Sequence, residues 1–280
     1  MYDRFASVYD QLMSDIPYAQ FAELFRTCVQ YTNREPRRVI DLGCGTGAMF
    51  PYMIHDARMI MGVDPSAPML AVAAKRVQEH GVSRRISLYQ GMADSFSVPE
   101  KAQWCVAFCD VFNYILTPEE LVASFSRVRD NLTLDGYFLF DVHSVQKAQS
   151  GIGRGEYFDV SDEAVALMRT DFDAMTRMIS YDLLLFSREE DGRYQRVDEW
   201  HKQRVHTLSE ILRALSAAGF SKVHIGSDFS FAFNEESTVA MPQLEAQDDD
   251  MNQTAIEVVT CVDRDSLHHA QRWFFLATDK

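Results

Sequence analysis

The residues that could do chemistry in this chain begin with three alternate glycines, Gly43, Gly45 and Gly47, which follow the short apolar run at residues 38–42. A short apolar run that stops at a glycine is typical of a buried parallel strand. Glycine can adopt positive φ and has no Cβ, so such a loop lets the backbone approach a ligand closely. A helix beginning after the loop would add free N–H groups and a partial positive charge. We therefore expect a ligand-binding loop rather than a tight turn alone.

Two carboxylates near this loop indicate which ligand it holds. A dinucleotide-binding loop reads G-x-G-x-x-G and places a pyrophosphate at the helix N-terminus, whereas this chain has G-x-G-x-G preceded by Asp41. Asp41 would repel a phosphate but could accept a hydrogen bond from an ammonium group. Asp64 ends the next apolar run, at residues 59–63, and could accept bonds from both hydroxyls of a ribose. An amino acid joined to a ribose suits S-adenosyl-L-methionine (SAM), which we predict as the cofactor.

The segments at residues 39–47 and 62–66 resemble the motifs of class I SAM-dependent methyltransferases. The likeness covers most of the chain, from Tyr2 to about Asp228 together with the last strand. It is greater for small-molecule enzymes that carry an antiparallel insert after the fifth strand, such as amino-sugar N,N-dimethyltransferases and glycine N-methyltransferase. A poorly characterised bacterial subgroup is more similar still, and four segments carry that likeness: residues 2–13, 109–114, 140–144 and 199–204.

The resemblance implies a role for each residue that matches a family motif. Asp41 would lie near the ammonium group of SAM, Asp64 would bind the ribose hydroxyls, and Met69 would lie against the adenine. Tyr9 and Tyr18 would form part of a lid over the cofactor, although either could be an ordinary half-buried aromatic residue. The residues expected to contact the cofactor are Tyr9, Tyr18, Asp41, Gly43, Cys44, Gly45, Gly47, Asp64, Met69, Met92, Asp94 and Asp110.

Two of these positions have an open alternative. Asp110 follows the fourth apolar run and would lie near the methionine end of the cofactor or the reacting methyl group, but it could instead cap a helix. Relatives often have an aspartate after the third strand that accepts a hydrogen bond from the adenine amino group, whereas residues 90–95 read QGMADS here. Either Asp94 takes that role from a displaced position, or the acid is absent and Met92 packs on the ring.

Candidate catalytic residues are few, because methyl transfer from a sulfonium needs alignment and exclusion of water more than proton transfer. A base is needed only when the acceptor must lose a proton. His143 follows the fifth strand and should face the cleft, which makes it the first candidate for a base or an acceptor contact. His201 is the second, and either histidine could instead be merely hydrogen-bonded or solvent-facing. Asn113 and Tyr114, just past Asp110, would contact the acceptor.

The elements that must position these residues follow from apolar runs that alternate with helical patterns. Such an alternation indicates right-handed βαβ units and a mostly parallel sheet. We predict an α/β fold with a doubly wound, mostly parallel, seven-stranded Rossmann-like sheet. Helices are expected at residues 18–31 and 67–80, and capping boxes place further helix starts at Thr117 and Thr207. The expected strands are residues 38–42, 59–63, 86–89, 104–109, 137–142, 222–225 and 272–277.

The pattern changes between residues 151 and 206, where strand-like stretches and a turn at 189–192 predict an antiparallel β insert that would cap the acceptor. Residues 1–36 would form an N-terminal helical lid, and residues 37–150 and 207–280 the SAM-binding core. Residues 234–270 are an acidic insertion between the last two strands, expected to be a solvated loop. Its three aspartates at 248–250 lack the interleaved glycine of a calcium loop, so no metal site is expected.

Composition limits the partners of the chain. Its 41 acidic and 27 basic residues give a formal net charge of −14, which disfavours nucleic acids and anionic membranes. Scattered cysteines, with no signal peptide or apolar span, predict a cytoplasmic protein. We expect a monomer or homodimer that methylates a nitrogen or an oxygen of a small-molecule acceptor. A methyltransferase acting on RNA or protein, or a non-catalytic SAM-binding regulatory module, remains the alternative.

Overall fold

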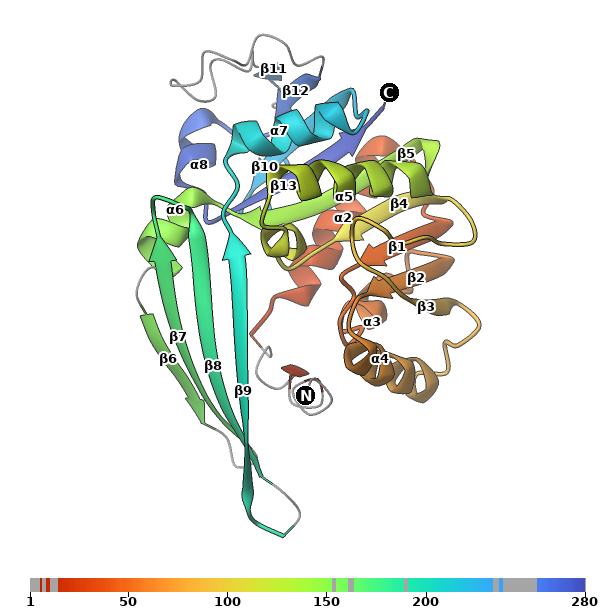
Figure 1. Ribbon diagram of the computed structural model, residues 1–280. Helices are drawn as coiled ribbons and strands as arrows, with labels where there is room; N and C mark the ends of the chain where they lie inside the picture. The colour runs from red at the N-terminus through yellow and green to blue at the C-terminus, as the bar shows by residue number, and fades with distance from the viewer. Residues whose placement is uncertain are drawn as a thin grey trace.

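Two β-sheets form the frame of the chain (Figure 1): a nine-stranded sheet and a separate four-stranded sheet. The computed structural model describes residues 6, 9–10, 15–152, 155–160, 164–188, 191–233, 237–238 and 256–279. Most of the segment at residues 2–13, part of the turn at 189–192 and the three aspartates at 248–250 lie outside the described residues. The predicted fold class, a mostly parallel α/β sheet with an antiparallel insert, is confirmed.

The large sheet has β1 (Arg38–Leu42) as the third strand from one edge, paired in parallel with β2 (Met59–Asp64) on one side and β4 (Ala102–Ala107) on the other. After its first residue β1 is fully buried, as expected for an apolar strand covered on both faces. Its carboxyl end therefore lies beside that of β2, which is where open α/β sheets bind ligands. The other strands of this sheet are β3 (Ile86–Gln90), β5 (Leu132–His143), β10 (Lys222–Ser227), β11 (Ser237–Thr238), β12 (Glu257–Thr260) and β13 (Arg272–Thr278).

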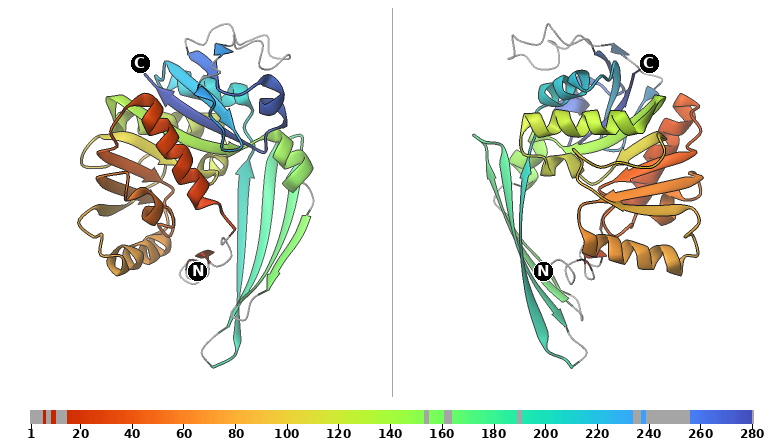
Figure 2. Two further views of the ribbon diagram at one scale, coloured as in Figure 1. Left: turned by 180° about the vertical axis from the view of Figure 1, so that it is seen from behind. Right: turned by 45° about the vertical axis from the view of Figure 1, so that its right-hand side comes forward.

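Helices cover both faces of the large sheet (Figure 2). One buried cluster packs α5 (Pro118–Asn131) and α7 (Leu208–Ala217) against the sheet. A second cluster packs α2 (Tyr18–Thr32), α3 (Phe50–Met53) and α4 (Ala67–Glu79) against it. None of the helices within the described ranges is long and apolar enough to span a membrane. The shorter elements are η1 (Val111–Tyr114), α6 (Val145–Lys147), η2 (Ala148–Ile152) and α8 (Arg264–His269).

Two helices begin where the sequence predicts a capping box. At the start of α5 the Thr117 hydroxyl accepts a hydrogen bond from the N–H of Glu120, and the Glu120 carboxylate accepts one from the N–H of Thr117. Thr207 and Glu210 make the same reciprocal pair at the start of α7. Each box satisfies two backbone donors that a helix otherwise leaves without partners, so it fixes the residue at which the helix begins.

Two details of the large sheet differ from the predictions. Within the described residues the sheet has nine strands rather than seven, because β12 and β11 come from the insertion that was expected to be a solvated loop. The apolar, β-branched run of β12 pairs in parallel with β10 and is mostly buried. The fourth strand also ends earlier than predicted, at Ala107, because Cys109 and Asp110 adopt positive φ angles of 65° and 54° that end the strand.

The four-stranded sheet is the insert predicted at residues 151–206, and it lies beside the large sheet, near the carboxyl ends of the parallel strands (Figures 1 and 2). All of its strands pair antiparallel with their neighbours. One face is more buried than the other, and we call it the inner face; in the last strand it carries residues 195, 197, 199, 201 and 203. The strands are β6 (Gly155–Val160), β7 (Ala164–Asp173), β8 (Met178–Arg188) and β9 (Tyr194–Arg204).

Candidate cofactor and acceptor site

Asp41 brings a buried carboxylate without a hydrogen-bond partner to the carboxyl end of β1. Its side chain is 3% exposed, and its Oδ2 atom has no hydrogen-bond partner among the described residues. Burial, together with the neighbouring Asp64 carboxylate, raises the pKa of Asp41 to about 7. Buried polar atoms are almost always paired in folded proteins, so an orphaned carboxylate oxygen at a strand end indicates a missing donor.

Asp64 occupies the corresponding position at the end of β2. Its Oδ2 accepts a 2.9 Å hydrogen bond from the N–H of Gly45, and its Oδ1 accepts a 2.8 Å bond from the N–H of Ser66. Burial raises the pKa of Asp64, and these two hydrogen bonds oppose that rise. Each carboxylate oxygen keeps a further lone pair, so Asp64 can accept two more bonds, as a ribose diol requires.

The glycine loop between these two carboxylates has room for a ligand. At Gly45, which has a φ of 52°, an added Cβ would meet no atom within 4 Å, so the backbone there borders open space. At Gly43 an added Cβ would lie 2.4 Å from Cγ2 of Val111, so that glycine is required by packing. Cys44, between them, is buried, and burial raises the pKa of its thiol well above its usual range. Open space at Gly45 beside an unpaired carboxylate fits a cationic amino acid such as the methionine part of SAM.

The N-terminal segment reaches this loop through Asp10 and Tyr9. Asp10 accepts a hydrogen bond from the Thr46 hydroxyl and pairs with Arg76 of α4. Tyr9 packs against the small sheet, and burial, with Tyr114 as the next largest cause, raises its pKa well above its usual range. Residues 9 and 10 therefore contact the loop, α4 and the small sheet, and the lid role of Tyr9 stays a prediction.

Tyr18, the other predicted lid residue, lies at the start of α2. Its ring stacks 6.0 Å from that of Tyr52, centroid to centroid. Burial raises its pKa, with Cys109 as the next largest cause. The structure thus places Tyr18 near the end of β4, where the reacting end of a cofactor is expected.

The predicted adenine contacts come from two places, α4 and the loop after β3. Met69, in α4, packs against the buried cluster of the small sheet. Met92 follows β3 and is 56% exposed, and Asp94 is exposed as well. Which of the last two residues contacts the adenine stays a prediction.

Asp110 is the centre of a buried polar network that the sequence did not reveal. Its carboxylate accepts a 2.7 Å hydrogen bond from Nε2 of Gln203 and pairs with Arg272 at 3.2 Å. Burial alone would raise its pKa, but His143, Arg272 and Lys147 outweigh burial and lower the pKa of Asp110 to about 2. Its side chain makes no helix-capping bond. Asp110 therefore stays ionised and links the large sheet to the small one.

His143 is held at both ring nitrogens by this network. Its Nε2 lies 3.3 Å from Oδ1 of Asp110, and its Nδ1 lies 3.1 Å from Nζ of Lys147. The side chain is buried, and burial lowers its pKa and that of Lys147. A neutral imidazole with both nitrogens engaged is well placed to position Asp110 but has no nitrogen facing an acceptor.

The left-handed turn after β4 is fixed by Asp141 of β5. One carboxylate oxygen of Asp141 accepts a 2.9 Å hydrogen bond from the N–H of Cys109, and the other accepts a 3.1 Å bond from the N–H of Asp110. Arg272 of β13 pairs with Asp141 as well as with Asp110. Consecutive positive φ angles at non-glycine residues store strain, so they persist only where surrounding contacts impose them.

Asn113 and Tyr114, the predicted acceptor contacts, are placed differently from each other. Asn113 is fully buried; its Nδ2 donates to the carbonyl of Arg204, and its Oδ1 accepts from the N–H of His143. Its amide is thus used to join β5 to β9. Tyr114 is 49% exposed, and its ring lies 6.2 Å from that of His201 on the inner face.

The inner face of the small sheet adds polar groups near this point. Burial lowers the pKa of His201, which pairs across the strands with Tyr181. The Tyr181 hydroxyl donates a 2.9 Å hydrogen bond to Oε1 of Gln203, whose Nε2 donates to Asp110. The sequence prediction missed Tyr181, Gln203, Arg272 and Lys147 as members of the site.

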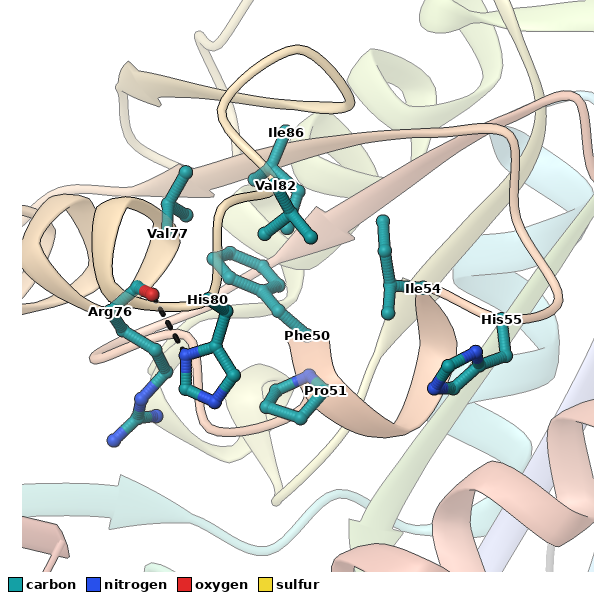
Figure 3. A pocket seen from close by; sticks show the side chains of 9 residues that line it. All are labelled: Phe50, Pro51, Ile54, His55, Arg76, Val77, His80, Val82 and Ile86. Carbon is teal, nitrogen blue, oxygen red and sulfur yellow. Dashed lines mark hydrogen bonds between the residues drawn. The ribbon is translucent and has the colours of Figure 1, made fainter.

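A cavity of about 200 Å³ between α3 and α4 contains none of the predicted site residues (Figure 3). It lies under the helices rather than at the carboxyl ends of the strands, so it does not compete as the reaction site. No three His, Cys, Asp or Glu side chains are grouped to hold a metal ion in the part of the chain that the structure describes. The lining residues are Phe50, Pro51, Ile54, His55, Arg76, Val77, His80, Val82 and Ile86.

Comparison with known proteins places this site in a family. The model of the methyltransferase domain matches residues 39–136. A predicted methyltransferase of Geobacillus sp. (strain WCH70) is 31% identical over 231 residues, which cover 82% of this chain and 92% of that protein. A predicted methyltransferase of Bacillus subtilis (strain 168), YqeM, is 29% identical over 82% of this chain and 90% of its own length.

Solved structures share the fold across both sheets. A SAM-dependent methyltransferase from Clostridium acetobutylicum ATCC 824 superposes with a TM-score of 0.77 at 21% identity, over 99% of this chain and 98% of its own. The sugar N-methyltransferase KedS8 from Streptoalloteichus sp. ATCC 53650 has a TM-score of 0.68 at 15% identity, over 98% and 93%. The residues at the ends of β1 and β2 fit SAM, and the chain belongs to the class I SAM-dependent methyltransferases.

Proposed function

We propose that the chain transfers the methyl group of SAM to a nitrogen, or to an oxygen, of a small-molecule acceptor. The observation that carries this proposal is the packing of the inner face against Tyr9 and Met69. A contact at this place would narrow access to the carboxyl edge of the large sheet and so limit the size of an acceptor. The net charge of −14 disfavours a polyanion, and the neighbour KedS8 is a sugar N-methyltransferase with the same fold.

Three features of the chain would hold the cofactor. The unpaired Oδ2 of Asp41 would accept a hydrogen bond from the ammonium group, and the remaining lone pairs of Asp64 would accept the ribose hydroxyls. The open space at Gly45 would let the backbone lie against the methionine part. When bound, SAM supplies a methyl group on a sulfonium: the acceptor lone pair forms the new bond to carbon, and the electrons of the broken carbon–sulfur bond stay on sulfur.

Of the two histidines, His201 is better placed to take a proton from the acceptor. Both nitrogens of His143 are engaged, by Asp110 and Lys147, so we assign His143 a positioning role. His201 lies on the inner face near Tyr114, and its lowered pKa keeps a ring nitrogen unprotonated at neutral pH. The Asp110 network would hold the turn after β4 in place beneath the acceptor, while the small sheet excludes water.

The test is to follow the methyl group. The purified chain is incubated with methyl-tritiated SAM in three separate reactions. One contains a small-metabolite extract, one contains total RNA and one contains a protein extract. We expect label in small molecules only, and we expect Asp64→Ala to remove both this label and SAM binding measured by calorimetry. Label in RNA or protein would contradict the proposal. SAM binding without transfer in any fraction would instead favour a regulatory module.

A further inference from the structure

Glu199 places a second orphaned carboxylate in the molecule, on the inner face of the small sheet. Its side chain is only 9% exposed, and Oε1 has no hydrogen-bond partner in the described part of the chain. Its neighbours along β9, Asp198 and Trp200, are exposed, so Glu199 points to the opposite, covered face. Burying a carboxylate oxygen without a partner costs free energy, because its hydration is lost and nothing replaces it.

The surroundings of Glu199 place it on the side of the sheet that faces the proposed cofactor site. Alternate residues of a strand share a face, so Glu199 lies between Val197 and His201. Its cross-strand partner is Leu183. Val197 and Leu183 belong to the cluster that contacts Tyr9 and Met69. Along the inner face of β9, Glu199 therefore lies next to Val197, which packs near Tyr9 and Met69, and next to His201, the proposed base.

Glu199 differs from Asp110, the carboxylate at the centre of the polar network after β4. Arg272, His143 and Gln203 already surround Asp110 with donors and positive charge, so a ligand would find it saturated. Among the described residues Oε1 of Glu199 accepts no hydrogen bond, and the group that feels its charge is His201. A carboxylate in a covered environment is suited to bind a cation, because electrostatic attraction is stronger where water is excluded.

We propose that Glu199 binds the amino group of the acceptor, so that the methylated substrate is a primary or secondary amine rather than an alcohol. The inference rests on the proposed function. An ammonium nitrogen first gives one proton to His201, which frees its lone pair. That lone pair bonds to the methyl carbon, the electrons of the carbon–sulfur bond stay on sulfur, and the nitrogen becomes positive again. Glu199 thus stabilises charge that develops in the transition state, which an alcohol acceptor would not need.

The experiment begins with the products that the full chain forms from deuteromethyl SAM and a small-metabolite extract, assigned by mass spectrometry and NMR. The amine found this way is then used with Glu199→Gln, which keeps the shape and removes the charge. The matched control is Asp198→Asn, on the exposed face of the same strand, where Asp198 pairs with Arg196. We expect Glu199→Gln to lower kcat/KM for the amine by at least about 30-fold, as for a buried charged contact, and Asp198→Asn to change it less than about twofold.

Two further readouts separate binding from structure. Glu199→Gln should keep the SAM affinity and should unfold at the same temperature or a higher one, because it removes an unpaired buried charge. Glu199→Asp should retain part of the activity. Methylation on oxygen, or wild-type kcat/KM in Glu199→Gln, would overturn the inference while leaving small-molecule transfer intact. Parallel losses of activity and melting temperature in both Glu199 variants would also overturn it. No labelled small molecule at all would overturn the proposed function itself.

Discussion

Replacing Asp41 by asparagine is predicted to change stability and cofactor affinity in opposite directions. The carboxyl group is buried, and its Oδ2 has no hydrogen-bond partner among the described residues. Burial, followed by the nearby Asp64 carboxylate, raises its pKa to about 7. Asparagine has almost the same shape without the charge, so the variant isolates what the charge does.

The size of the stability change follows from the pKa shift. From 3.8 to about 7 is a shift of about 3 units, which corresponds to about 4 kcal/mol. Because the folded chain keeps this proton at pH values where the unfolded chain has lost it, stability falls as pH rises from about 4 to 7, and the cost is complete above pH 7. The unpaired amide of the asparagine variant itself costs about 1–3 kcal/mol of stability, which offsets part of the gain from removing the charge. Asp41→Asn should therefore be more stable than the wild type by about 1–3 kcal/mol at pH 8, and less stable by about 1–3 kcal/mol near pH 4, where only the cost of the amide remains.

The affinity for SAM should change in the other direction. At pH 6 about nine in ten wild-type molecules carry the Asp41 proton, so binding an ammonium group there should release about 0.9 proton. Affinity should rise by up to about tenfold per pH unit below pH 7 for the same reason. A hydrogen bond to a charged group contributes about 1.5–3 kcal/mol, so Asp41→Asn should bind SAM about 10- to 100-fold more weakly at pH 7 and release no proton.

Calorimetry between pH 5.5 and 7.5, in buffers of different ionisation enthalpy, measures the affinity and the proton count together. This range stays below the ordinary pKa of the amino group of SAM, about 8. Urea unfolding at pH 5 and pH 8 measures the stability. Asp130→Asn, which removes a charge from an exposed side chain, is the control. Equal proton release by Asp41→Asn and the wild type would refute the reasoning, and so would wild-type affinity in Asp41→Asn.

Three further outcomes are expected. Gly43→Ala places a Cβ 2.4 Å from Val111 and should lower the free energy of unfolding, measured in urea, by about 2–3 kcal/mol. Gly45→Ala should lower it by about 1 kcal/mol but should weaken SAM binding at least about tenfold. Equal effects of the two variants on both measurements would contradict these expectations. Asp141→Asn breaks a buried pair and should cost about 3–5 kcal/mol; an unchanged unfolding midpoint would rule this out. His201→Gln should lower kcat about 100-fold or more and remove the fall in rate toward acid pH, and an intact acid limb would exclude His201 as the base.

Most of the large sheet could be predicted because its strands are apolar runs separated by helical patterns. The prediction for β1 matches the observed strand residue for residue, and both capping boxes mark their helix starts. The strand β12 was missed because its four residues stand alone in an acidic insertion and gain stability only by pairing with β10. Local patterns cannot show such long-range pairing.

The site was predictable only where residues follow parallel strands, since those ends meet at one edge of the sheet. Asp41 and Asp64, at the ends of β1 and β2, are predicted this way. Arg272 comes from an antiparallel strand 131 residues after Asp141, with which it pairs, and no local signal marks it. The engagement of both nitrogens of His143 likewise depends on side chains that only the folded chain brings together.

The most direct test of the account is a crystal structure of the chain with S-adenosylhomocysteine. We expect the amino group of the ligand within hydrogen-bond distance of Oδ2 of Asp41, its ribose hydroxyls on Asp64, and its sulfur directed at the space between the turn after β4 and the inner face of the small sheet. A ligand bound elsewhere, or an Asp41 carboxylate that still has no partner in that complex, would contradict the account.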